Sequence, residues 1–336
     1  MKRSITSYVV CALSISACIG AHELAAVTHE AFQAVNADGT SAFSGPAEVV
    51  LEGIILNAPE EILDPTPGTP TFMGGQWQIY LQGEGDDHAG TALWMGQYYN
   101  HINGDSDSYT NEEWINEICR LNHDPNTGYL FHAGDRVRVT GRYLPYRGKL
   151  NINENHFIDP EFDFSLKLLE PAVGLPQPEV VTLDELKDIN NNFVFDQTRN
   201  SGCEYYQGRL IRINGVSFVN PENWGPDAPL EITDGSIRTF PVKVGIGRGF
   251  EQPNNLPAVF DVIGILDQED EVGPFREGYR LWVPNYDGNG LVLTDRGYRR
   301  GNLPADVNHD GNVDLFDLAD MANDWLKVAP GIGECP

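Results

Sequence analysis

Short apolar strands that contain a glycine, and that recur along the chain, limit most strongly what this sequence can fold into. Gly53 lies within the apolar segment 49–56, and Gly208 lies within the segment 205–213. A glycine inside a strand marks a bulge or a sharp bend. The chain also has 35 Gly and 22 Pro among its 336 residues, a composition that favours many turns and short strands over long helices. The sequence therefore predicts a mainly β protein made of a repeated unit.

The repeated unit has further landmarks in the same order. Segments 137–141 and 260–264 each alternate and end in a glycine, and alternation predicts strands with one buried and one wet face. Each is followed by a hairpin signal and a last strand, at 146–152 and at 278–283. The other predicted strands are 77–81 and 91–95 in the first unit and 230–233 and 239–244 in the second. About five short strands per unit indicate a small closed barrel.

This pattern resembles the tandem OB-fold domains of exported bacterial proteins, some of which accompany nuclease or other hydrolase domains. The glycine-marked first strand, the V-x-V-x-G strand and the final G-x-x-L-x-[IV] strand carry the resemblance. It implies two OB-like β-barrels, the first at 45–160 and the second at 203–295. A pair of β-sandwiches is the alternative fold.

A helical insertion is expected at residues 97–130, within the first barrel. Thr110 and Glu113 have the spacing of a capping box at a helix start. Four apolar residues then fall on one helical face: Trp114, Ile115, Ile118 and Leu121. Between the barrels, residues 161–202 are expected to form a linker with a short helix, which the capping-box pair Thr182 and Glu185 would start.

The most specific motif is a loop near the carboxyl end, followed by an apolar helical face. Oxygen-bearing residues occupy its positions 1, 3, 5, 7, 9 and 12, and Gly311 occupies position 6. This spacing gathers oxygens around one point, as a hard cation with six to eight ligands at about 2.3–2.6 Å requires. An Asp- and Asn-rich turn that caps the helix without metal is the alternative. The predicted calcium ligands are Asp306, Asn308, Asp310, Asn312, Asp314 and Asp317.

This loop and helix, at about residues 305–327 within a tail of 303–336, resemble a single repeat of a type I dockerin. Dockerins of that family carry two such repeats and bind cohesin domains on scaffold proteins, often in extracellular polysaccharide degradation. The resemblance implies a cohesin-like or cell-surface protein as partner. A calcium-stabilised terminus that folds on itself is the alternative.

The amino-terminal residues 1–21 have the three parts of a secretory signal. Lys2 and Arg3 precede a short apolar run, and small residues follow it. The run is too short to span a bilayer, which takes about 20 apolar residues. Cleavage after Ala21 would release the protein, whereas the segment before Cys18 resembles a bacterial lipobox and would make Cys18 a lipid anchor. Both alternatives predict an extracellular or cell-surface location, with no transmembrane segment.

Three cysteines remain after signal removal: Cys119, Cys203 and Cys335. An odd number cannot all pair within one chain. A Cys119–Cys203 disulfide is one interpretation, since exported proteins meet oxidising conditions. Two buried free thiols and one exposed tail thiol are the other.

A basic and aromatic cluster in the first barrel is the candidate ligand site. It stands out because the chain has 22 basic and 49 acidic residues, a net charge of −27. OB barrels bind strands or sugars with aromatic platforms and local basic groups, so polysaccharide or single-stranded nucleic acid is the expected ligand. A solvated outer strand face is the alternative. The candidate residues are Arg142, Tyr143, Tyr146, Arg147 and Lys149.

These features together favour a secreted or surface-attached, non-catalytic, calcium-binding modular protein that acts as a binding or adaptor protein. The net charge argues against sequence-independent binding to duplex DNA or to an anionic membrane. No G-x-S-x-G or H-E-x-x-H motif is present, so no catalytic residue is assigned. A hydrolase or hydrolase subunit in extracellular polysaccharide or nucleic acid degradation, and a single-stranded nucleic-acid-binding OB protein, are the alternatives.

Overall fold

The computed structural model describes residues 25–62, 75–100, 108–224, 230–244, 252, 256, 258–284 and 291–292. The predicted signal segment with Cys18, and the whole predicted calcium tail, lie outside the described residues. No helix within the described ranges is long and apolar enough to cross a membrane.

The first barrel has five strands in the order β1-β2-β3-β5-β4, and it closes because β1 also pairs with β4. All its pairs are antiparallel except β3 with β5. A further strand, β6 (Ser165–Glu170), adds to the outer edge of β4. The barrel strands are β1 (Glu48–Ile55), β2 (Gln76–Gln82), β3 (Gly90–Gly96), β4 (Arg136–Tyr146) and β5 (Lys149–Asn153).

The second barrel repeats this topology. Its strands follow the order β8-β9-β10-β12-β11, β8 pairs with β11 to close it, and β10 with β12 is again the parallel pair. A short β13 (Leu291–Val292) adds to β11. The barrel strands are β8 (Leu210–Phe218), β9 (Leu230–Thr233), β10 (Thr239–Val244), β11 (Phe260–Gln268) and β12 (Tyr279–Val283). The prediction of two OB-like barrels is confirmed, and closure of both sheets excludes the β-sandwich alternative.

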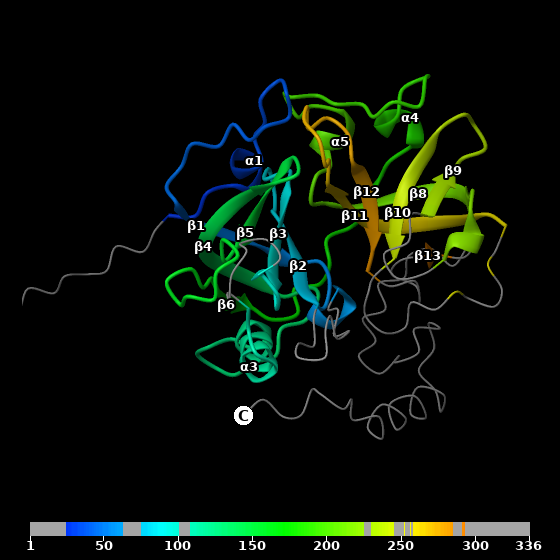
Figure 1. Ribbon diagram of the computed structural model, residues 1–336. Coiled ribbons are helices and arrows are strands. Elements are labelled where there is room, and N and C mark those ends of the chain that lie inside the picture. Colours follow the sequence, from blue (N-terminus) through cyan, green and yellow to red (C-terminus); the bar gives the residue numbers. More distant parts are fainter. Residues whose placement is uncertain are drawn as a thin grey trace, which may run out of the picture.

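Each barrel is preceded by a segment of the same kind; the short helix predicted at Thr182 and Glu185 is confirmed, but its counterpart before the first barrel was not predicted. Val27 donates its backbone N–H to Val50 of β1, and Val181 donates its own to Arg212 of β8. A capped helical turn follows in both cases, α1 (His29–Phe32) and α4 (Leu183–Leu186). Figure 1 shows both turns, with α5 (Gly202–Tyr205), at the same end of the molecule. The repeated unit therefore begins before the barrel itself: Val27 lies 21 residues before the start of β1, and Val181 lies 29 residues before the start of β8.

Helix α3 (Asn111–Asn122) lies between β3 and β4, at the end of the first barrel opposite α1 (Figure 1). Its capping box is present as predicted: the Thr110 side chain accepts from the Glu113 N–H, and the Glu113 carboxylate accepts from the Thr110 N–H. Trp114 and Leu121 are buried in the barrel core. Trp77 of β2 also donates its ring N–H to Asn122 at 2.7 Å. The helix thus closes the barrel end with its apolar face.

One of the two glycines that suggested the repeat was assigned wrongly. Gly53 lies in β1, where a Cβ would come within 2.6 Å of the Gln82 carbonyl. Gly208 precedes β8 and is not part of it. The bulge of the second barrel instead lies at Gly215, which has a φ of +66° beside a register shift between β8 and β11. Gly53 therefore corresponds to Gly215, and Gly208 has a different role.

Candidate functional site

OB barrels bind extended ligands on the outer face of their second and third strands. In the first barrel these strands are β2 and β3, and their outward side chains Tyr80 and Ala92 are 1% and 3% exposed. Both belong to a separate apolar cluster that the second barrel completes. The second barrel contributes Leu210, Ile263, Ile265 and Trp282 to this cluster. The part of the usual ligand face around Tyr80 and Ala92 is therefore buried between the two barrels.

Two hydrogen bonds donated by backbone N–H groups also join the barrels at this contact. Gln82 of β2 accepts a hydrogen bond from the Leu210 N–H at 2.9 Å, and Gly90 of β3 donates its N–H to the Gln207 carbonyl at 3.0 Å. Gly90 and Gly208 meet backbone to backbone, so that a Cβ on either one would overlap the other. Gly208 has a φ of +73° and suits glycine for that reason as well. Its role is close approach between the barrels.

A buried ionic network lies at the edge of this contact. Lys149 is 6% exposed, and its ammonium group pairs with Asp267 of the second barrel. Arg280 donates to the other oxygen of Asp267 at 3.0 Å, and Arg147 lies 3.6 Å from Glu269. Burial alone would raise the pKa of Asp267, but Lys149 and Arg280 hold that pKa below its usual value. Two members of the predicted basic cluster, Arg147 and Lys149, thus join the barrels.

The other three predicted ligand residues also have partners within the protein. Arg142 pairs with Glu161 at 2.9 Å. Tyr143 packs its ring edge-on against Phe32, with centroids 5.6 Å apart. Tyr146 lies beneath the Arg147 guanidinium, 5.2 Å from its ring centroid. The structure therefore brings these five residues close along β4 and β5, but it matches their cations with carboxylates.

The corresponding face of the second barrel is different. The outward side chains of β9 and β10 alternate with core residues, and all of them are half-buried, whereas on β2 and β3 only Gln76 and Trp94 are half-buried and the other outer residues are buried. The loop that follows α4 touches this face at one edge, where the Asn191 side chain donates to the Thr239 hydroxyl at 3.2 Å and accepts from the Thr239 N–H at 2.9 Å. The side chains on it are Glu231, Thr233, Thr239, Pro241 and Lys243.

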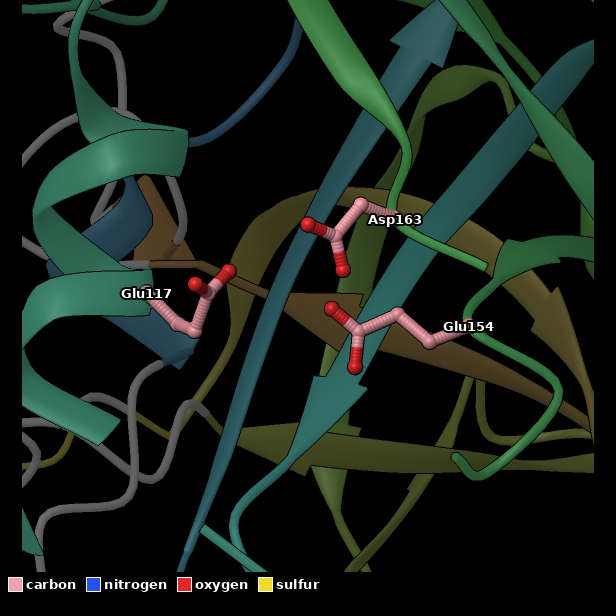
Figure 2. A group of neighbouring side chains, drawn as sticks. All are labelled: Glu117, Glu154 and Asp163. Atoms are coloured by element: carbon pink, nitrogen blue, oxygen red, sulfur yellow. The ribbon is translucent and has the colours of Figure 1, made fainter. Parts of the chain in front are cut away.

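A group of three carboxylates lies at the α3 end of the first barrel (Figure 2). Glu117 comes from α3, Glu154 directly follows β5, and Asp163 precedes β6. One oxygen of each lies within 4.8 Å of the others. Glu154 is fully buried, and its Oε2 accepts hydrogen bonds from the hydroxyls of Tyr109 at 2.9 Å and Tyr99 at 3.2 Å.

The environment of this group disfavours negative charge. Burial raises the pKa of Glu154 to about 8, although the Tyr109 hydrogen bond opposes the shift. Burial also raises the pKa of Glu117 and that of Asp163, each against the opposing charge of Arg120. Perturbed carboxyl groups that converge on one point are typical of functional sites. Sequence reasoning missed this group because its members are separated by up to 46 residues and match no motif.

The cysteines differ from both earlier interpretations. Cys119 of α3 is disulfide-bonded, whereas Cys203 is a buried free thiol. The two are therefore not bonded to each other, and Cys119 is not a free thiol. Cys335 lies outside the described residues.

Comparisons with known proteins add little to this geometry. No family model matches the chain, and no curated protein matches it. Among solved structures, it is similar to a chain of a replication protein A heterotrimer bound to single-stranded DNA, with 10% identity and a TM-score of 0.28. The match covers 69% of this chain and 46% of that one. A likeness of this size carries no argument about the ligand of this protein.

Proposed function

We propose that this is an exported, non-catalytic binding protein whose ligand face is the β9–β10 surface of the second barrel. The observation that carries the proposal is the contrast between the barrels: most outer side chains of β2 and β3 are buried (Gln78, Tyr80, Gln82 and Ala92), whereas all those of β9 and β10 are half-buried. A face that binds an extended ligand must be accessible before the ligand arrives. The candidate site therefore moves from the first barrel, where the sequence had suggested it, to the second.

The chemistry of this face favours an uncharged polysaccharide. Glu231 and Lys243 offset each other, and Thr233 and Thr239 contribute hydroxyl groups. Sugar hydroxyls both donate and accept hydrogen bonds, as such a mixed surface requires. A polyanion would instead meet a protein of net charge −27, in which the described arginines of β4 are already paired with carboxylates.

The carboxyl-terminal loop contributes the second part of the proposal. Calcium held by the six oxygen-bearing residues from Asp306 to Asp317 would order the tail, and the tail would then dock on a cohesin-like or other cell-surface protein. The signal segment supports export, with Cys18 as an alternative lipid anchor. These steps rest on the sequence motifs alone.

Native gel electrophoresis through gels that contain soluble polysaccharides tests the ligand face. The probes are hydroxyethylcellulose, xylan, laminarin and mixed-linkage β-glucan, with immobilised single-stranded DNA as a separate arm. We expect retardation by at least one polysaccharide, and loss of that retardation in the double variant Glu231→Ala and Lys243→Ala. The matched control is Lys167→Ala, an exposed lysine on β6 of the first barrel.

Three results would contradict the proposal. Retardation that survives the double variant would place the ligand elsewhere. Salt-sensitive retention on single-stranded DNA that depends on Arg142 would restore the first-barrel site. Reproducible cleavage of any probe, with or without EDTA, would show a hydrolase.

A further inference from the structure

We propose that Glu117, Glu154 and Asp163 bind a hard divalent cation of the calcium type at the α3 end of the first barrel. This site is separate from the carboxyl-terminal loop, and it does not depend on the polysaccharide-binding function. In Figure 2 the three carboxyl groups point toward one another from a helix and from two segments that flank barrel strands. Their oxygens, all within 4.8 Å of one another, are close enough to bind one ion at about 2.3–2.6 Å each.

An unsatisfied atom in the group gives an independent reason for a ligand. The side chain of Glu154 is 0% exposed. Its Oε2 receives two tyrosine hydroxyls, but its Oε1 has no hydrogen-bond donor. Buried carboxylate oxygens nearly always have a hydrogen-bond partner, because they cannot bind solvent water and an unpaired buried oxygen is costly. A cation beside Oε1 would supply the missing partner.

Arg120 does not fill this role. Its Nε donates to Glu117 at 2.6 Å, and its Nη1 donates to the Phe164 carbonyl at 2.6 Å. Only Nη2 faces the other two carboxylates, at 3.8 Å from Glu154 and 4.0 Å from Asp163. Both distances exceed that of a hydrogen bond, and Nη2 itself has no hydrogen-bond partner. When all three carboxyl groups are ionised, one guanidinium faces three negative charges, and a divalent cation would balance the remaining two.

The donor set and its access select the class of ion. All three side chains offer carboxylate oxygens, which suit hard cations such as calcium or magnesium over zinc or copper. Glu117 and Asp163 are 20% and 26% exposed, so the ion would enter from solvent on their side and keep several waters there. Because Glu117 belongs to α3 and Glu154 follows β5, the bound ion would fasten the helix to the barrel.

Terbium luminescence tests this site in the full-length chain. The ion replaces calcium at oxygen sites, and excitation at tyrosine wavelengths sensitises it when an aromatic ring is near. Tyr99 and Tyr109 both hydrogen-bond to Glu154. The tail loop is silenced with Asp306→Ala and Asp310→Ala, so that any remaining signal comes from the barrel.

We expect saturable emission in the tail-silenced protein, displaced by calcium, with at least a tenfold loss of affinity in Glu154→Gln. Glu112→Gln, an exposed substitution on the same helix, is the matched control and should bind normally. Circular dichroism checks that each variant folds, and Glu117→Gln replaces Glu154→Gln if the latter does not. The proposal is overturned if the tail-silenced protein gives no saturable terbium emission in calcium-free buffer, if calcium does not displace that emission, or if both site variants bind as the control does. Polysaccharide retardation of these variants, measured separately, should stay unchanged.

Discussion

In the first barrel most outer side chains of β2 and β3 are buried, among them Tyr80 and Ala92 against the second barrel, whereas in the second barrel all the corresponding side chains of β9 and β10 are half-buried. The two barrels share strand order and closure. They differ because the contact between them is not symmetric: the first barrel uses its β2–β3 face, and the second uses the outer sides of β8, β11 and β12. A fold therefore supplies a binding face only where its neighbours leave that face free.

The contact between the barrels also differs from either core in its polarity. The two core clusters are apolar, but the contact buries Lys149 and Asp267, with the half-buried Arg280, beside Tyr80 and Trp282. Trp282 donates its ring N–H to Asp267 at 3.2 Å. Charges buried in this way specify one arrangement, since any other would leave them unpaired.

The largest effect is expected from a substitution that disrupts the contact between the barrels. Asp267→Ala leaves the buried Lys149 and the half-buried Arg280 with Glu269 as their remaining shared carboxylate, 3.7 Å from the Lys149 ammonium group. Removal of one partner from a buried ion pair costs about 3–5 kcal/mol, so the free energy of unfolding in urea should fall by that amount. A change under about 1 kcal/mol would show that the network does not hold the barrels together.

The next prediction concerns how the stability of the folded protein depends on pH, and it rests on a difference between the buried glutamates of the two barrels. Glu204 in the second barrel has Arg199 at 3.2 Å and the Tyr279 hydroxyl as partners, whereas Glu154 has no cation within hydrogen-bond distance. The pKa of Glu154 is raised from 4.5 to about 8. The unfolded chain therefore ionises first, and the folded state loses stability as pH rises between these two values.

Glu154→Gln removes this dependence. In EDTA, the unfolding free energy of the wild-type protein should fall between pH 6 and pH 8 by about 2–3 kcal/mol more than that of Glu154→Gln, since a tenfold change in proton affinity corresponds to about 1.4 kcal/mol. Urea titrations at three pH values measure it. Parallel pH profiles of the two proteins would show that Glu154 ionises normally.

A smaller effect distinguishes two reasons for glycine: close approach to another backbone, and a left-handed backbone conformation. Gly208 and Gly215 both have positive φ, at +73° and +66°, but only Gly208 touches another backbone. Alanine at Gly215 should cost about 1–2 kcal/mol from the left-handed conformation alone. Alanine at Gly208 should cost about 1–3 kcal/mol more, because its Cβ pushes the barrels apart. Equal losses in the two variants would mean that the contact at Gly90 adapts freely.

The smallest effect concerns the basic residues that the sequence singled out. Arg142 and Glu161 form a pair with side chains 34% and 64% exposed, and exposed pairs contribute about 0–1 kcal/mol. Arg142→Ala should therefore leave the thermal midpoint almost unchanged. It should also leave polysaccharide retardation unchanged, because the proposed face lies on the other barrel. Loss of retardation in this variant would return the site to the first barrel.

The strands could be predicted because alternation and glycine placement are local properties: segments 230–233 and 239–244 match β9 and β10. The role of Gly208 could not be predicted from the sequence. Both Gly208 and Gly215 lie beside apolar residues, and only the pairing of β8 with β11 shows which of them is at the bulge. Lys149 was read as a ligand residue since its carboxylate partner, Asp267, is 118 positions away. The carboxylates around Glu154 were missed for the same reason. Local pattern predicts the elements, whereas the pairing of charges depends on which elements meet.

Thiol labelling of two single-cysteine additions tests the central claim most directly, with the unmodified chain as background. Ala92→Cys lies on the outer face of β3 and Thr233→Cys on the outer face of β9. If the barrels dock as described, a maleimide should label the cysteine at position 233 within minutes and the cysteine at position 92 only as fast as the protein unfolds. Equally fast labelling at both positions would mean that the first barrel keeps its ligand face open.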